Sequence, residues 1–349
     1  MYYTKEGYLD FEQLLKADNS TYKFIVGGRG IGKTFGILKY MIEHKIKFIF
    51  MRRTQTQVDM IKSDELNPFK ALYSVLGKDW LFNVENINKN ISAVYKTVYV
   101  PEDNIYKSTG SPLAYIMALS TVSNIRGFDA SDVDYLVYDE FIGEKHEKAI
   151  AGEGTAFLNA IETIARNREL QGRQPMKVIS MSNSTNLANP IFIQLKIITA
   201  CEKLMKQGKD RLVLKDRDLS IYFLHNSPIS KQKANTSLYK LSGKDSDFTK
   251  MSLDNQFNRE YFGQVKHRKL SEFKALVVVG EIVIYRHKSR MEWYVTDHLS
   301  GHPDETYESS EIELKRFRHD YYYLKLAYLN RHVFFESYIQ QVLFEQYIH

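Results

Sequence analysis

The first part of the chain alternates short apolar runs with segments of helical periodicity. Apolar runs of about four to eight residues between polar flanks indicate buried strands, whereas apolar residues recurring once per helical turn indicate helices. Strands alternating with helices are typical of a parallel sheet covered on both faces, so we expect an α/β fold with a mostly parallel sheet. The predicted strands are 22–26, 48–51, 92–100, 114–119, 134–138 and 177–183, and the predicted helices are 11–15, 35–42 and 155–164.

The pattern changes at residue 226. Residues 226–262 are polar, turn-rich and poorly periodic, which indicates a linker or a small linker subdomain. Beyond it, the stretches 273–285 and 291–296 alternate like strands, and 321–348 is predicted to be helical. We therefore expect three parts: an amino-terminal domain over 1–225, a linker subdomain over 226–262 and a smaller α+β carboxy-terminal domain over 263–349.

Composition and charge narrow the class of protein. The 349 residues suit two domains of ordinary size, and 44% hydrophobic with 26% charged residues is typical of a globular protein. The net charge of +6 permits a polyanionic partner without requiring one. Cys201 is the only cysteine, which excludes an intrachain disulfide and fits a reducing compartment. The first residues lack a signal-peptide pattern and no apolar run could span a bilayer, so we expect a soluble intracellular protein without a membrane partner.

The strand predicted at 22–26 runs into the most informative motif of the chain. This motif fits G-x-x-x-x-G-K-[ST], and a predicted helix follows it directly. A strand that turns into a helix aims backbone N–H groups at an anion, and glycines let a phosphate approach the backbone closely. Lys33 would hold the β- and γ-phosphates of ATP, and Thr34 would bind Mg²⁺. The candidate nucleotide-binding residues of the motif are Gly27, Gly28, Arg29, Gly30, Ile31, Gly32, Lys33 and Thr34.

A second motif lies where the strand predicted at 134–138 ends in two carboxylates. Asp139 can hold the ligand shell of Mg²⁺, and Glu140 can polarise the attacking water. A solvated acidic turn would have the same sequence, but its combination with the phosphate-binding motif favours ATP hydrolysis. Kinases that share the motif use a substrate nucleophile and need no glutamate at this position. The two motifs together predict a P-loop NTPase of the additional-strand, catalytic-glutamate type.

Other polar residues are candidates for the same site. Asn183 follows the next predicted strand and would either sense the γ-phosphate or cap the following turn. Arg52 and Arg53 would either contact nucleotide or pair with the region of Asp139. An arginine finger stabilises the transition state of γ-phosphate transfer, and a finger offered to a neighbouring subunit requires a ring. The candidates for the finger, with ordinary surface positions as the alternative, are Arg126, Arg166 and Arg168.

With these motifs in place, the chain resembles the DNA-packaging ATPases of small tailed phages with protein-primed genomes, the phi-29 group. The matching segments occur in the same order over most of the chain. The last of them has no generic nucleotide-binding meaning and is therefore the most specific. The segments are Gly28–Lys33, Arg52–Arg53, Asp139–Ile142, Arg166–Glu169, Ser182–Asn183 and Met251–Phe257.

The resemblance implies a homo-oligomeric ring, described as pentameric, that acts in the host cell cytoplasm while docked on the portal of a procapsid. ATP hydrolysis with Mg²⁺ at the subunit interfaces would translocate double-stranded DNA, and a phage structural RNA would bridge the motor and the procapsid. By the same resemblance, Arg166 is the favoured trans finger and Arg126 is a second trans-acting basic residue. The carboxy-terminal domain would be a vestigial, inactive RNase H-like nuclease.

Two alternatives remain open. One is a large terminase with an active nuclease, which would need several carboxylates converging on two metal ions, with Asp297 as one candidate. The other is a nucleic-acid-binding scaffold whose ATP site only regulates assembly. The basic clusters 266–269 and 315–319 could contact the phosphates of DNA or RNA, or form solvated faces.

Overall fold

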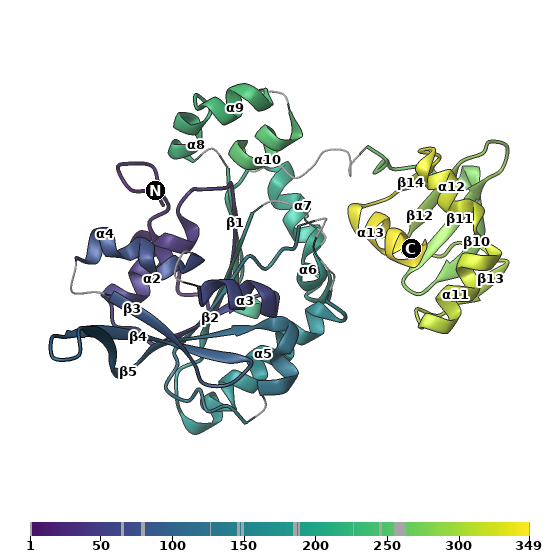
Figure 1. The fold of residues 1–349 in the computed structure, drawn as a ribbon. Helices are drawn as coiled ribbons and strands as arrows, with labels where there is room; N and C mark the ends of the chain where they lie inside the picture. The colour runs from purple at the N-terminus through teal and green to yellow at the C-terminus, as the bar shows by residue number, and fades with distance from the viewer. Residues whose placement is uncertain are drawn as a thin grey trace. The chain divides into compact units, whose positions relative to one another are not determined.

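The computed structural model describes residues 2–348 apart from 64–65, 78–80, 126, 145–146, 148–149, 184–186, 188, 226, 244–245 and 255–262. The chain forms two compact units (Figure 1). The first unit comprises residues 1–195 and 203–257, and the second comprises residues 196–202 and 258–349. Arg126 and the end of the predicted 251–257 motif lie outside the described residues. The three-part division expected from the sequence stays a prediction.

A nine-stranded sheet lies at the centre of the first unit over its described residues, in the order β3-β4-β5-β2-β6-β7-β1-β9-β8. Neighbouring strands from β5 to β9 in this order are parallel, and the antiparallel pairs involve β3, β4 and β8 at the two edges. The predicted mostly parallel sheet is therefore confirmed. Its strands are β1 (Tyr22–Gly27), β2 (Phe48–Arg52), β3 (Leu81–Asn86), β4 (Ile91–Val100), β5 (Ile105–Ala118), β6 (Tyr135–Asp139), β7 (Lys177–Ser182), β8 (Arg211–Leu214) and β9 (Leu219–Leu224).

Side chains of β1 show that helices pack on both faces of this sheet. Ile25 belongs to the core cluster formed with α1 and α2. Its neighbour Phe24 contacts the aromatic rings of Phe157 on α5 and Phe192 on α6, at centroid distances of 6.1 and 5.2 Å. The helices of this part of the chain are α1 (Phe11–Ala17), α2 (Lys33–Glu43), α3 (Gln55–Ile61), α4 (Tyr73–Leu76), α5 (Glu153–Ala165), α6 (Pro190–Gln194) and α7 (Ile198–Lys206).

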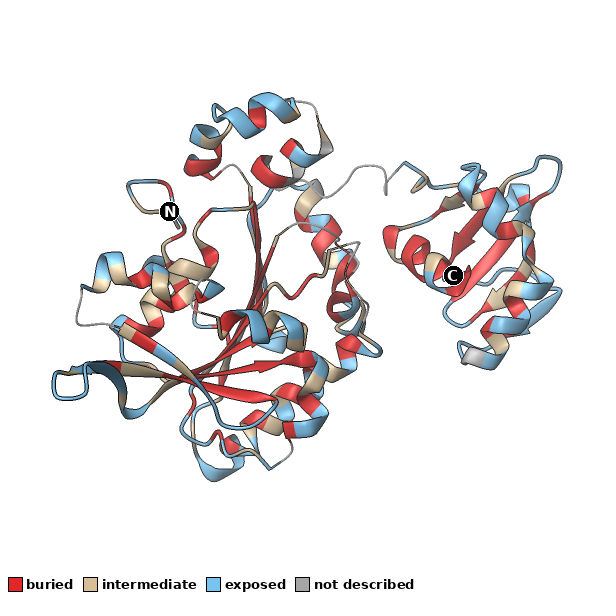
Figure 2. Cartoon of the chain, viewed as in Figure 1, coloured by how far each residue is buried: buried red, intermediate tan, exposed pale blue. Residues whose placement is uncertain are grey.

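Burial explains which strands the hydrophobic pattern predicts. β6 is buried at every residue after its first, because neither face of a parallel sheet meets solvent. The red strands at the centre of the larger sheet in Figure 2 show this burial. The edge strands β3 and β8 are mostly intermediate or exposed, and the sequence analysis did not predict them. It also missed β9, although every residue of β9 is buried.

Residues 228–254 form three short helices that belong to the first unit, and we call them the three-helix segment. Its polar sequence forms helices of only six to eight residues. Ile229 nevertheless joins the main core cluster of the unit. The helices are α8 (Pro228–Lys233), α9 (Ser237–Ser242) and α10 (Asp247–Asp254).

The second unit contains a five-stranded sheet in the order β13-β10-β11-β12-β14 over its described residues. The strands predicted at 273–285 and 291–296 are confirmed. The prediction that 321–348 is entirely helical is wrong, because 333–335 form a strand that pairs in parallel with β12. Val333 and Phe335 alternate with a less buried residue, which is the period of a strand. The elements are β10 (Phe273–Val279), β11 (Ile282–His287), β12 (Trp293–Thr296), β13 (Glu305–Tyr307), β14 (Val333–Phe335), α11 (Glu311–Asp320), α12 (Tyr323–Leu329) and α13 (Tyr338–Ile348).

Candidate functional site

The phosphate-binding motif forms the turn between β1 and α2. β1 ends at Gly27 and α2 begins at Lys33. Gly30 and Gly32 have φ angles of +69° and +86°, which glycine adopts without strain. The turn borders a cavity of about 260 Å³ that also meets the ends of β6 and β7. The residues lining this cavity are Arg29, Gly30, Gly32, Lys33, Thr34, Phe35, Asp139, Glu140, Ser182 and Asn183.

Lys33 lies inside this site, and the residue is only 8% exposed. It donates hydrogen bonds to the carbonyl oxygens of Gly27 and Gly28, at 2.9 and 2.8 Å, and to Oδ1 of Asn183 at 3.0 Å. Burial disfavours the charged form and lowers the pKa of Lys33 to about 8. An anion in the cavity would stabilise the ammonium, so this lysine is suited to hold a phosphate.

Asp139 ends β6 and is buried beside the first turn of α2. Its Oδ2 accepts a hydrogen bond from the hydroxyl of Thr34 at 2.7 Å and lies 3.2 Å from a guanidinium nitrogen of Arg52. Burial raises the pKa of Asp139, and the positive charge of Arg52 opposes this shift. A hydroxyl and a carboxylate this close form an oxygen donor set of the kind that Mg²⁺ prefers.

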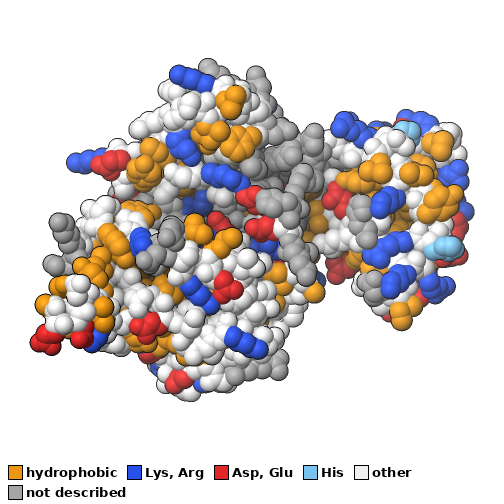
Figure 3. Space-filling view, in the orientation of Figure 1, with side chains coloured by type: hydrophobic (Ala, Val, Ile, Leu, Met, Phe, Trp, Pro, Cys, Tyr) orange, Lys and Arg blue, Asp and Glu red, His pale blue; other side chains and the backbone are white. Residues whose placement is uncertain are grey.

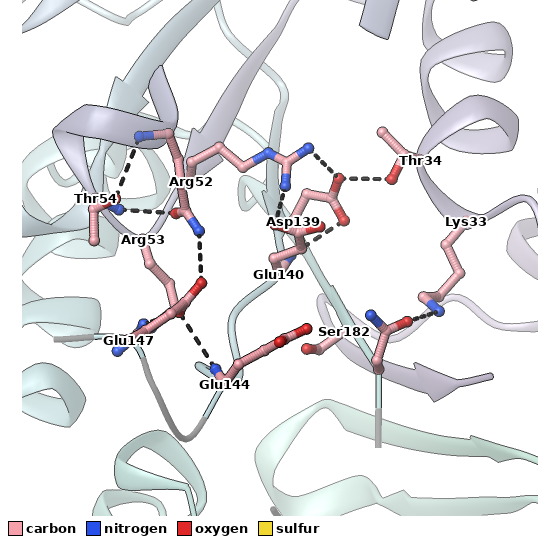
Figure 4. Close-up of polar contacts among 12 residues, drawn as sticks. Lys33, Thr34, Arg52, Arg53, Thr54, Asp139, Glu140, Glu144, Glu147 and Ser182 are labelled. Carbon is pink, nitrogen blue, oxygen red and sulfur yellow. Dashed lines mark hydrogen bonds and ion pairs between the residues drawn. The ribbon is translucent and has the colours of Figure 1, made fainter. Parts of the chain in front are cut away.

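Glu140 follows Asp139 with a φ of +58°, a conformation uncommon for residues other than glycine. Its carboxylate lies 2.5 Å from Nη1 of Arg52, and the residue lines the cavity (Figure 4). Of the two alternatives for Arg52, the structure thus shows pairing with the region of Asp139. Backbone outliers of this kind cluster at functional sites, where the surrounding structure holds them in place.

Arg53 fits neither alternative that the sequence left open. Its guanidinium makes two hydrogen bonds to the carboxylate of Glu153, at 2.7 and 2.9 Å, and a third to Glu147 at 2.6 Å. The side chains of Arg53 and Glu153 are 4% and 2% exposed. This arginine therefore ties β2 to the start of α5 instead of contacting the Asp139 region or a nucleotide.

The order of strands brings the two motifs together in the predicted way. β7 lies between β1 and β6, so one strand separates the phosphate-binding turn from the paired carboxylates. Asn183 directly follows β7, and its side chain accepts the hydrogen bond from Lys33. This contact places the amide of Asn183 beside Lys33, and the role of Asn183 stays a prediction.

The arginine-finger candidates differ in their surroundings. Arg168 is buried and donates to the carbonyl of Val133 at 2.6 Å and to the carboxylate of Asp134 at 2.9 Å. Arg166 is exposed, with a φ of +46° at the end of α5. Of these two arginines, Arg166 is the one that could extend towards a neighbouring molecule.

The second unit contains the residues considered from the sequence for nuclease activity and nucleic-acid binding. Among the described residues, no group of three or more His, Cys, Asp or Glu side chains could hold a metal ion. Asp297 is exposed. Lys and Arg side chains are spread over the visible face of this unit (Figure 3), and some are paired, as Arg316 is with Glu313 at 2.7 Å.

No described helix is long and apolar enough to cross a bilayer.

Comparison with known proteins decides the family. Residues 3–307 match the family model described as podovirus DNA encapsidation protein (Gp16). The chain belongs to this family. DNA packaging proteins of Bacillus phages PZA and phi29 are each 24% identical to it over 263 residues, which is 74% of this chain and 66% of theirs. The chain thus spans just under two thirds of the length of these curated relatives.

Solved structures support the same fold. The Phi-28 gp11 DNA packaging motor covers 99% of this chain and 97% of its own, with a TM-score of 0.64 and 20% identity. The bacteriophage Phi-29 viral genome packaging motor assembly covers 98% of this chain and 99% of its own, with a TM-score of 0.63 and 17% identity. At these identities the likeness concerns the fold.

Several residues at the site have no signal in the linear motifs. Glu144 pairs with Arg29 of the phosphate-binding turn across more than a hundred positions of sequence. Lys233 and Ser252 of the three-helix segment contact the same arginine through its backbone. Only the fold brings these residues to the turn. Ser252 lies in the segment 251–257 that the family resemblance marks, whereas no pattern in a single sequence identifies Glu144 or Lys233.

Proposed function

We propose that this protein is an ATPase subunit of a viral DNA-packaging motor. The observation that carries the proposal is the cavity where the phosphate-binding turn meets Asp139, Glu140 and Asn183. Membership of the podovirus DNA encapsidation family supports packaging as the process that ATP hydrolysis would drive. The mostly parallel sheet, with one strand between the two motifs, supports assignment to the additional-strand, catalytic-glutamate P-loop NTPases.

The donor set in the cavity fits ATP with Mg²⁺. The buried ammonium of Lys33 would exchange a backbone carbonyl for oxygens of the β- and γ-phosphates. Thr34 and Asp139, 2.7 Å apart, would hold Mg²⁺ directly or through water. The ion would neutralise charge on the phosphates.

Glu140 would orient and polarise the water that attacks the γ-phosphate. Its side chain is 47% exposed and borders the cavity, so water can reach it. The ion pair with Arg52 engages Oε2 of Glu140, so Oε1 would be the oxygen that accepts a proton from this water. Asn183 would bind the γ-phosphate or the water from the end of β7.

The proposed function also includes a ring of subunits and its binding partners. Arg166 would reach the site of the next subunit in a homo-oligomeric, pentameric ring, and Arg126 would be a second basic residue acting in trans. Double-stranded DNA, the procapsid portal and a phage structural RNA would be the partners, during transient binding to procapsids in the host cytoplasm. The carboxy-terminal part would be an RNase H-like domain without nuclease activity.

The experiment that tests this function compares Glu140→Gln with the unaltered protein. We expect the variant to bind ATP with unchanged affinity and to hydrolyse it at least about a hundredfold more slowly, because the amide cannot act as a base. Binding of a fluorescent ATP analogue and steady-state phosphate release measure the two properties. Full turnover by Glu140→Gln would remove this residue from the mechanism.

Mixing variants tests whether the site is shared between subunits. Arg166→Ala subunits keep Glu140, and Glu140→Gln subunits keep Arg166, so mixed rings contain some complete sites. Partial recovery of ATPase activity on mixing two inactive proteins would support a finger in trans. If no ratio of the two restores activity, Arg166 does not act across an interface.

A further inference from the structure

The three-helix segment contacts the phosphate-binding turn at two successive peptide groups. The backbone N–H of Arg29 donates to the carbonyl oxygen of Ser252 on α10 at 3.1 Å. The carbonyl oxygen of Arg29 accepts a hydrogen bond from Nζ of Lys233 at the end of α8. The segment therefore binds the backbone of the turn on both sides of one residue.

Two glycines of the turn provide the space for these contacts. The motif G-x-x-x-x-G-K-[ST] requires Gly27 and Gly32 but leaves positions 28 and 30 free. A Cβ atom on Gly28 would lie 2.6 Å from the carbonyl oxygen of Ser252, and one on Gly30 would lie 2.8 Å from Nζ of Lys233. Both distances are shorter than a normal van der Waals contact. A side chain at either position would therefore clash with the docked segment, and glycine avoids this clash.

The contact with Lys233 fixes the direction of a phosphate-binding group. The carbonyl of Arg29 and the N–H of Gly30 belong to one planar trans peptide, so they point in opposite directions. Because the carbonyl points towards Lys233, the N–H points away from the three-helix segment. Gly30 lines the cavity, and backbone N–H groups of such a turn are the donors that cradle phosphates. A cationic donor on the carbonyl also polarises the peptide and strengthens its N–H as a donor.

Lys233 is itself held in place. The residue is partly buried, and its ammonium lies 5.6 Å from the ring centroid of Tyr239 on α9. Tyr239 is 5% exposed and stacks with Phe248 of α10 at a centroid distance of 5.8 Å. The position of this ammonium thus depends on the packing of all three helices.

We propose that Lys233 is a positioning residue for nucleotide binding and that it couples ATP binding to the docking of the three-helix segment. The inference rests on the proposed ATP site, and it adds a residue and a segment that the nucleotide motifs do not contain. Coupling between two binding events is reciprocal. ATP therefore stabilises the docked segment, and any force that moves the segment weakens ATP binding.

The test is equilibrium binding of a fluorescent ATP analogue with Mg²⁺ to the full chain. Lys233→Met removes the charged donor and keeps an unbranched side chain that is one atom shorter, and we expect its Kd to rise about tenfold. KM for ATP should rise in parallel, with kcat at saturating ATP within about twofold of the original. Lys233→Arg should recover most of the affinity, because arginine can donate to the same carbonyl. Lys231→Met, an exposed position on the same helix, is the matched control and should bind like the unaltered protein.

Hydrogen exchange provides a second readout that does not depend on affinity alone. In the unaltered protein, saturating nucleotide should slow amide exchange across 228–243 and 246–254, and in Lys233→Met this protection should be largely lost even when the site is saturated. Thermal unfolding of Lys233→Met confirms that the variant is folded. A Kd within twofold of the original, together with retained protection, would overturn the inference.

The outcomes separate this inference from the proposed function. Lys33→Ala serves as the reference for loss of the ATP site itself. If the unaltered protein binds ATP but does not hydrolyse it, and Lys233→Met weakens that binding, the proposed hydrolysis fails and the positioning role stands. If hydrolysis is normal and Lys233→Met binds ATP normally, the positioning role fails and the proposed function stands.

Discussion

The two arginines that follow each other at the end of β2 have different partners. Arg52 pairs with both carboxylates at the end of β6, at a site open to the cavity. Arg53 is enclosed by Glu153 and Glu147. The hydrogen bonds to Glu153 raise the pKa of Arg53 above its already high value, so its guanidinium stays charged. The same residue type therefore serves the site at one position and the fold at the next.

Removing Arg53 should destabilise the first unit strongly. Arg53→Met leaves the carboxylate of Glu153 buried without its partner, and we expect a loss of about 3–5 kcal/mol in the free energy of unfolding. Urea unfolding followed by circular dichroism measures it. Lys39→Met is the control, because its pair with Glu43 lies on an exposed helix face and should contribute less than about 0.5 kcal/mol. Equal midpoints for the two variants would show that the buried pair is not a stability determinant.

The motif residues of the candidate site were predictable because each is close in sequence to a strand end. Lys33 and Thr34 lie shortly after the end of β1. Asp139 is the last residue of β6, and Glu140 directly follows it. Parallel strands place such residues at one edge of the sheet, where ligands bind. The partners Glu144 and Lys233 were not predictable, because their positions depend on loop paths and on how short helices dock. Ser252 lies in the segment 251–257 that the resemblance marks, but its contact with the turn was not predicted.

At the scale of elements, the predictions succeeded where burial on both faces produces continuous apolar runs. β1, β2, β6 and β7 are of this kind. The carboxy-terminal prediction failed at β14, where three residues between two helices pair with β12. A strand this short has too few residues for its period to be recognised, and tertiary pairing decides its conformation.

The buried carboxylate of Asp18 gives a prediction about how the free energy of unfolding depends on pH. Asp18 is 3% exposed and accepts hydrogen bonds from the hydroxyl of Tyr222 on β9 at 2.6 Å and from the backbone of Ser20 at 2.9 Å. Burial alone would raise the pKa of Asp18, but these hydrogen bonds outweigh it and hold the pKa well below its usual range. Tyr222→Phe should therefore lower the free energy of unfolding at pH 7 by about 1.5–3 kcal/mol.

The sign of the pH dependence follows from the lowered pKa. Asp18 stabilises the folded state fully above its unfolded pKa of about 3.9, and the contribution is lost as the pH falls towards the lower folded value. The difference between Tyr222→Phe and the unaltered protein should thus be constant from pH 7 to pH 5 and shrink below about pH 4. Urea midpoints at pH 7, 5 and 3.5 check this, with the exposed Tyr106→Phe as control. A difference that grows on acidification would contradict it.

At the scale of the whole molecule, the first unit contains both the cavity and the three-helix segment, and the second unit contains a separate sheet with its own core. The family match reaches from residue 3 to residue 307 and so includes residues of both units. A motor needs a site whose structure changes with ATP and a part that transmits this change. In the proposed function, the cavity is the ATP site, and the three-helix segment contacts its phosphate-binding turn and could transmit the change.

The most direct test of the central claim is a DNA-protection assay. Procapsids and phage DNA are incubated with ATP and the protein, with and without phage structural RNA, and DNA that resists added nuclease is measured. The account predicts protection by the unaltered protein and none by Glu140→Gln, which still binds ATP. Protection by Glu140→Gln equal to that of the unaltered protein, or no protection by the unaltered protein under either condition, would contradict it.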